Sequence, residues 1–350
     1  MNTSTSLQWF RRLAALGALW ALLVVILGAW VRLSAAGLGC PDWPGCYGHL
    51  SAESAAQNVA GVNTAFPERP FEYQKAVKEM LHRYVASGLL LLIVVLAGLA
   101  LRNRHDPAQP VKLPLFLVGL VVLQALLGMW TVTLLLKPLI VVLHLLGGLA
   151  TFGLLGWLAM DPAAAAPATV KDAPWLPRLA VIAMLVLSAQ ITLGGWTSSN
   201  YAALACPDFP TCQNQLWPDM DVGEAFVLWR GLGIDYEGGV LDNPARIAIH
   251  FVHRLGAVVA AVMLGWLALS VLRRSRDPAL RTSAVLLAAA LVLQLIVGPL
   301  MVMRGLPLLL ATAHNGMAAV LLLCVVRVAR LLHPTPTSIL APANASLLPT

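Results

Sequence analysis

Residues 82–101 read HRYVASGLLLLIVVLAGLAL, with no charged side chain between Arg83 and Arg102. An α-helix rises about 1.5 Å per residue, so about 20 such residues cross a hydrocarbon core of about 30 Å. Seven further apolar stretches of similar length occur, and the sequence therefore predicts an all-α integral membrane protein with eight transmembrane helices. The eight stretches are approximately 13–33, 82–101, 113–135, 139–160, 178–198, 248–272, 283–303 and 306–326.

The composition of the whole chain agrees with this class. Of the 350 residues, 59% are hydrophobic and 11% are charged, whereas soluble domains carry about 25% charged residues. This excludes a soluble enzyme, a disordered chain and an ordinary nucleic-acid-binding protein. The formal net charge of +7 is therefore attributed to cytoplasmic loops, with lipid and not nucleic acid as the surrounding partner.

Basic residues between the stretches predict the orientation. Thirteen of the 23 Lys and Arg lie on one side, whereas the long loops 34–81 and 199–247 lie on the other. Because Lys and Arg are enriched in cytoplasmic loops, we expect a multi-pass protein of the cell (inner) membrane with both termini cytoplasmic. The thirteen residues are Arg11, Arg12, Arg102, Arg104, Lys112, Lys171, Arg178, Arg273, Arg274, Arg276, Arg281, Arg327 and Arg330.

The two halves of the chain repeat the same motifs. LGAW at 27–30 matches LGGW at 193–196, CPDWPGC at 40–46 matches CPDFPTC at 206–212, and two His-Arg pairs and two Gln-x-x-x-Gly motifs follow. The sequence therefore predicts two pseudo-symmetric four-helix bundles, at 1–160 and 178–330. A cytoplasmic linker at 161–177 would join them, and a disordered tail would occupy 331–350.

Four histidines occupy equivalent positions in the repeat: His82, His144, His253 and His314. Histidine inside a membrane is costly and marks a candidate functional site, although a hydrogen bond across helices is the simpler alternative. Haem iron takes axial imidazoles and a four-helix bundle suits it, whereas zinc or iron alone needs further ligands. We expect the pairs His82–His144 and His253–His314. Small residues that would admit a flat porphyrin are Gly88, Gly147, Gly148, Gly256 and Gly316.

Charged residues accompany two of these histidines. Arg83 and Arg254 follow them directly, and each either pairs with a haem propionate or extends along the membrane interface. Three residues before the histidine stands Glu79 in the first half and His250 in the second. A carboxylate beside a haem pocket moves protons; the alternative is an acid exposed at the end of a loop.

Each half also carries a cysteine pair in an outer loop, Cys40 with Cys46 and Cys206 with Cys212. Two prolines and the short spacing favour a tight turn, and disulfides persist on the outer side of a membrane. Structural disulfides are favoured over a redox-active pair or a metal site shared by both loops.

Taken together, these residues resemble the heme A synthase family over about residues 13–330. The resemblance rests on E-x-x-H-R at 79–83, H-x-x-H-R at 250–254, His144, His314 and the two cysteine loops. It implies oxidation of the C8 methyl of heme O to a formyl group by successive hydroxylations. It further implies a resident haem b on His253 and His314, substrate heme O between His82 and His144, and Glu79 acting near the substrate.

Two other classes of function stay open on the residues alone. A di-haem b-type membrane electron carrier, linked to quinol, would hold two permanent haems, and a haem transporter or chaperone would bind haem without oxidising it. Heme O synthase and cytochrome c oxidase assembly factors are the expected protein partners of the enzyme, and a homo-oligomer is left open. The role of the loop insertion at 213–247 is also open, with docking of a partner as one hypothesis.

Overall fold

The computed structural model describes residues 3–160 and 173–332. Residues 161–172 of the predicted linker and 333–350 of the predicted disordered tail lie outside the described residues. Within the described ranges every regular element is a helix. Eight of these helices are long and apolar enough to cross a membrane, as the hydropathy of the sequence predicts. They are α1 (Thr3–Leu33), α4 (Tyr73–Arg102), α5 (Lys112–Thr133), α6 (Pro138–Ala159), α7 (Leu176–Ser199), α9 (Asn243–Arg274), α10 (Pro278–Met303) and α11 (Leu308–Leu332).

Helices α4 and α9 begin earlier than their apolar stretches, at Tyr73 and Asn243. In α9 the start is fixed by capping chemistry, because the Asp242 side chain accepts a hydrogen bond from the backbone N–H of Ala245 at 3.2 Å. Hydropathy does not detect these polar first turns. Glu79 and His250 consequently lie inside helices, 5% and 4% exposed, and the interpretation of Glu79 as an exposed loop-end acid is wrong.

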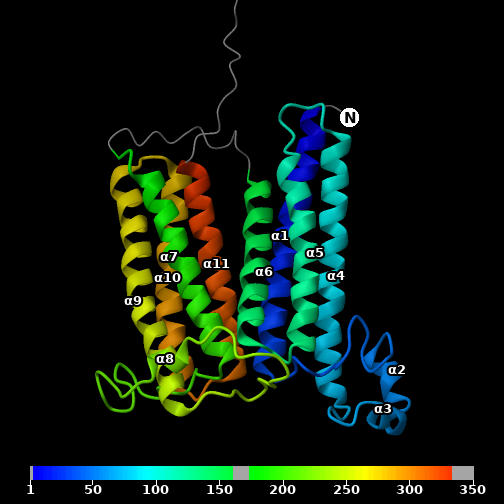
Figure 1. Ribbon diagram of the computed structural model, residues 1–350. Coiled ribbons are helices and arrows are strands. Elements are labelled where there is room, and N and C mark those ends of the chain that lie inside the picture. Colours follow the sequence, from blue (N-terminus) through cyan, green and yellow to red (C-terminus); the bar gives the residue numbers. More distant parts are fainter. Residues whose placement is uncertain (1–2, 161–172, 333–350) are drawn as a thin grey trace, which may run out of the picture.

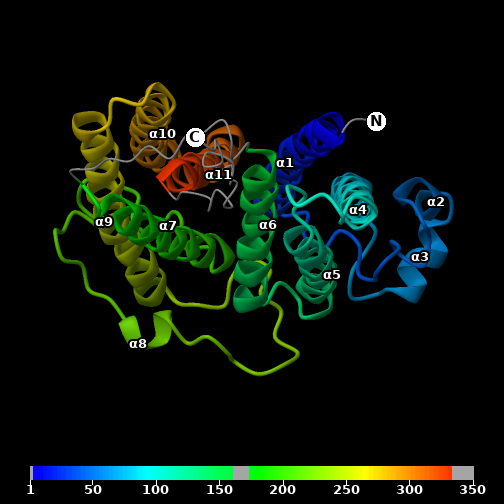
Figure 2. The same cartoon turned by 90° about the horizontal axis from the view of Figure 1, so that it is seen from above.

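The long helices pack in two rings of four (Figures 1 and 2). In the first, α1 and α5 each contact both α4 and α6, so α4 and α6 occupy opposite corners. In the second, α7 and α10 each contact both α9 and α11, which likewise occupy opposite corners. The rings meet where α1 and α6 pack against α7 and α11.

The main apolar core fills one end of the rings. In α1 the fully buried side chains run from Phe10 to Ala21, whereas within the described stretch from Leu22 to Trp30 no residue is fully buried. The same change occurs along α4, where residues buried in this core begin at Leu89 and His82 is only partly buried. The helix ends near the long loops are thus less densely filled than the opposite ends.

Both long loops lie at this less filled end (Figure 1). The loop between α1 and α4 carries the short helices α2 (Ala52–Ala56) and α3 (Val59–Ala65). The loop between α7 and α9 carries α8 (Val222–Ala225), which is held by the indole N–H of Trp196 donating to the carbonyl of Ala225 at 2.9 Å. In the view along the helices, α2 and α3 lie beyond α4 and α8 lies beside α7 and α9 (Figure 2).

The second loop also reaches the first ring. The backbone N–H of Tyr236 donates to the carbonyl of Leu135 at 3.0 Å, in the turn between α5 and α6. Arg69, from the first loop, forms ion pairs with Asp235 and Glu237. Residues 235–237 of the insertion at 213–247, for which docking of a partner was one hypothesis, thus join the two halves of the chain to each other.

Candidate functional site

The four repeated histidines lie on opposite corners of their rings. His82 is on α4 and His144 on α6, whereas His253 is on α9 and His314 on α11. Both members of each pair that the sequence predicts thus lie in the same ring of helices, on opposite corners. That the two imidazoles of a pair bind one haem stays a prediction.

Each histidine packs against a glycine on a neighbouring helix. A Cβ atom added at Gly28 would lie 3.0 Å from Cε1 of His82, and one added at Gly194 would lie 3.1 Å from Cε1 of His253. Gly128 and Gly298 stand in the same relation to His144 and His314, at 3.3 and 3.2 Å. These separations are tighter than ordinary van der Waals contact, so a larger residue at any of the four would push the imidazole ring.

The glycines that sequence reasoning selected serve other contacts. A Cβ added at Gly147 would meet the carboxamide of Gln124 at 1.8 Å, and one added at Gly256 would meet that of Gln190 at 2.3 Å. A Cβ at Gly88 would meet the indole of Trp20 at 2.6 Å. The glycines that do contact the histidines belong to motifs that both halves share, LG at 27–28 and 193–194 and the two Gln-x-x-x-Gly motifs. The motifs alone did not predict that these glycines contact the histidines.

The imidazoles are incompletely covered. All four side chains are only partly buried, yet Nδ1 of His82, His144 and His314 is buried without a hydrogen-bond partner. Two imidazoles on opposite corners of one ring of helices, each only partly buried, suit a planar metal complex that takes two nitrogen ligands.

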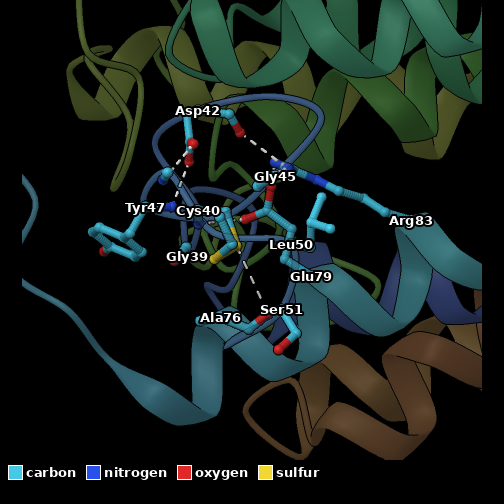
Figure 3. Close-up of a disulfide and its surroundings, with 12 residues drawn as sticks. Gly39, Cys40, Asp42, Gly45, Tyr47, Leu50, Ser51, Ala76, Glu79 and Arg83 are labelled. Atoms are coloured by element: carbon cyan, nitrogen blue, oxygen red, sulfur yellow. Dashed lines mark hydrogen bonds and ion pairs between the residues drawn. A yellow bond between two sulfur atoms is a disulfide. The ribbon is translucent and has the colours of Figure 1, made fainter. Parts of the chain in front are cut away.

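Glu79 and Arg83 lie one turn apart on α4 and hold the first cysteine loop (Figure 3). The Glu79 carboxylate accepts hydrogen bonds from the backbone N–H of Cys40 at 2.9 Å and from the Arg83 guanidinium. Arg83 also donates to the carbonyls of Asp42, at 2.9 Å, and Pro44, at 3.2 Å. The Asp42 side chain in turn closes the loop by accepting from nearby backbone N–H groups.

The second half builds the same support with different chemistry. The backbone N–H of Cys206 donates to Nδ1 of His250 at 3.3 Å. Arg254 donates to the carbonyls of Cys206 and Thr211 at 2.7 and 2.8 Å. A hydrogen bond from the Thr211 hydroxyl lowers the pKa of Asp208, the counterpart of Asp42. In both halves, therefore, the residue three positions before the histidine and the arginine after it fasten the cysteine loop.

Each cysteine pair forms its own disulfide, Cys40–Cys46 and Cys206–Cys212. The prediction that each pair forms a disulfide is confirmed, and the alternative of a metal site shared by the two loops is wrong. Whether either disulfide is redox-active stays open. In the part of the chain that the structure describes, no group of three or more His, Cys, Asp or Glu could hold a metal ion by itself.

Arg83 and Arg254 contact the cysteine loops, which the sequence did not predict. Pairing of Arg83 and Arg254 with haem propionates was one expectation, but four of the carbonyl oxygens that they contact belong to the cysteine loops. Each arginine holds the cysteine loop of its half against the helix that carries His82 or His253. Whether a propionate joins them stays a prediction.

Comparison with known proteins agrees with this architecture. The family model COX15-CtaA, described as cytochrome oxidase assembly protein, matches residues 11–326. A heme A synthase of Shewanella oneidensis is 42% identical over 326 residues, which cover 92% of this chain and 95% of the relative. A heme A synthase of Caulobacter vibrioides is 27% identical, over 87% of this chain and 92% of the relative. The chain, a multi-pass membrane protein, belongs to the COX15-CtaA family of cytochrome oxidase assembly proteins.

Proposed function

We propose that this chain is a heme A synthase, an oxidoreductase that converts the C8 methyl group of heme O into a formyl group. The observation that carries the proposal is the pair of opposed histidines in each ring of helices, in a chain 42% identical to a heme A synthase over 92% of its length. The reaction consumes heme O and delivers heme A for terminal oxidases.

The two rings are proposed to be pseudo-symmetric bundles, 1–160 and 178–330. The matched motifs support this division, and so does the identical order of packing neighbours around each ring. The outer ends of the bundles would carry the two haem sites at one depth. The basic side of the chain would face the cytoplasm, with both termini there.

Haem b is proposed as the resident group of the second bundle, held by His253 and His314, where it supplies one-electron transfer. Substrate heme O is proposed to bind between His82 and His144. The residues fit a haem in each case: two histidines lie on opposite corners of one ring of helices, a glycine backs each imidazole, and each side chain is only partly buried. Heme O synthase and oxidase assembly factors are the proposed partners.

Glu79 is proposed to act near the substrate by positioning. Its carboxylate is bound to the Cys40 N–H and to Arg83, and it lies one turn from His82 on the same helix. The loop that it fastens would close the outer side of the substrate site and exclude water from it. This is a positional role, and a proton-transfer role for the same carboxylate stays a prediction.

The glycines behind the histidines provide a test of the haem sites. We expect Gly194→Val to displace the His253 ring and to weaken haem retention about tenfold, or about 1.4 kcal/mol. Gly265→Val on α9 is the matched control, because a Cβ there would meet nothing within 4 Å. The measurement is haem b per protein after purification. Equal haem content in the two variants would show that close packing at Gly194 does not matter.

Expression in a host that makes heme O but not heme A tests the function itself. We expect heme A to be present in the host's membranes when the chain is expressed and absent when His82→Ala is expressed at the same level. The haems are extracted and identified by chromatography with mass detection. Membranes that contain only heme O and haem B despite a well-expressed wild-type chain would contradict the proposal.

A further inference from the structure

Glutamine side chains distinguish the two proposed haem sites. Gln294 lies 3.3 Å from Nε2 of His314, whereas its counterpart Gln124 is buried without a partner, and a further glutamine contacts His253. Gln190 on α7 places its amide nitrogen 3.1 Å from Nδ1 of His253 and 3.0 Å from the backbone carbonyl oxygen of the same residue. His253 is the one repeated histidine whose Nδ1 has a partner of this kind, since Nδ1 is buried and unpartnered in the other three described imidazoles, His82, His144 and His314.

The space for Gln190 is made by a glycine. A Cβ added at Gly256 would lie 2.3 Å from Oε1 of Gln190, so this carboxamide fits only because α9 has no side chain there. Gly256 stands three residues after His253, one turn along the same helix face. Gln190 stands four residues before Gly194, which packs on the same imidazole. Helix α7 thus contacts His253 of α9 at two points, Gly194 and Gln190.

The first half lacks both parts of this arrangement. Val24 stands four residues before Gly28, where the second half has Gln190, and Val85 stands three residues after His82, where the second half has Gly256. The two pairs fill a similar volume: the large Gln190 beside Gly256 in the second half corresponds to two valines, Val24 and Val85, in the first. Valine offers no hydrogen bond, which agrees with the unpartnered Nδ1 of His82.

We propose that Gln190 is a positioning residue that makes His253 a permanent haem ligand, and that its replacement by Val24 leaves His82 an exchangeable one. This inference rests on the proposed function, in which the second half keeps its haem and the first half takes up substrate and releases product.

The physical reason lies in the second nitrogen of the ligand. When Nε2 of an imidazole binds iron, Nδ1 carries the proton and needs an acceptor. The buried Oε1 of Gln190 has no partner and reaches Nδ1 when the carboxamide makes a half-turn. The turn breaks the bond to the His253 carbonyl, and the carboxamide must also shift away from that carbonyl because two acceptor oxygens repel. An acceptor at Nδ1 fixes the ring orientation and makes the imidazole a stronger donor.

A stronger donor ligand favours the ferric over the ferrous state and slows dissociation of the haem. Loss of an outer-shell partner typically weakens metal affinity about 10–100-fold. We therefore expect Gln190→Val to raise the midpoint potential of the resident haem and to speed transfer of that haem to an excess of a haem-scavenging globin about 10–100-fold. Gln190→Glu, which supplies a carboxylate acceptor, restores retention and lowers the potential.

Thr192→Val is the matched control on the same helix. Its hydroxyl bonds only to the Ser188 carbonyl within α7, at 2.8 Å, so this variant is expected to keep the wild-type potential and rate of haem transfer. The measurements are a potentiometric titration followed by optical and electron paramagnetic resonance spectra, on full-length purified protein. A merely structural residue would change stability without shifting the potential or the ferric spectrum.

The reverse exchange covers the case in which Gln190 variants fold poorly. Val24→Gln combined with Val85→Gly is expected to slow loss of haem from the first half. The inference is overturned if Gln190→Val keeps the wild-type potential, spectrum and transfer rate, or if the double exchange leaves retention at His82 unchanged. In a wild-type protein whose haem depends on His253, these results overturn the inference alone. A wild-type protein without resident haem overturns the proposed function as well.

Discussion

Replacement of His253 by alanine is expected to strip the second bundle of its haem b. The substitution removes an iron ligand itself, so the loss of affinity should exceed the about 10–100-fold typical of an outer-shell partner. His314 alone would remain on the opposite corner, on α11. The measurement is the haem-to-protein ratio of the purified variant, with the reduced-minus-oxidised optical spectrum as a second readout.

His105→Ala is the control for this prediction. His105 is exposed in the turn between α4 and α5, far from the loop-bearing end, and we expect its replacement to leave the haem content unchanged. His314→Ala should reproduce the loss seen with His253→Ala, which separates ligand removal from a local folding defect. A His253→Ala protein with its full complement of haem b would contradict the ligand assignment.

Replacement of Glu79 by alanine is expected to abolish most turnover and to leave the resident haem in place. The buried carboxylate holds both the Cys40 N–H and the Arg83 guanidinium, so its loss frees the loop above His82. A displacement of about 1 Å near a reacting group costs about 100-fold in rate. We expect a fall of that size in heme A formation, measured on purified protein with wild-type haem b content.

Glu53→Ala serves as the control, because Glu53 is an exposed acid on α2 of the same loop. Glu79→Gln separates the two contacts, since the amide oxygen still accepts from Cys40 whereas the charge that pairs with Arg83 is gone. If positioning is the role, the glutamine variant should retain more activity than the alanine variant. Full activity in Glu79→Ala would show that neither the loop contact nor the charge matters for turnover.

Much of the framework is predictable because it depends on local composition. The eight spans follow from apolar length alone, and the repeat places two of its histidines in each ring of helices. The disulfides follow from cysteines six residues apart with prolines between them. In each case the signal lies within one stretch or in the comparison of two stretches.

Features that depend on contacts between distant side chains were not predictable. Glu79 and Arg83 are recognisable in the sequence as part of the E-x-x-H-R motif. The residues around them do not predict that they bind backbone groups of residues 40–45. Lys137 is similar, since it is 2% exposed and its ammonium lies 4.0 Å from the centre of the Trp229 ring, across the two halves. The early start of α9 was missed because Asp242 caps a turn too polar for a hydropathy window.

The most direct test uses the full-length protein, purified from cells that make heme O and reconstituted in lipid. Haems are extracted before and after aerobic incubation with a reductant, then separated by chromatography with mass detection. The account predicts that heme O falls while hydroxylated heme and heme A rise, with haem b constant, and that His82→Ala stops the conversion. Constant heme O with no oxidised product, in protein that holds both haem b and heme O, would contradict it.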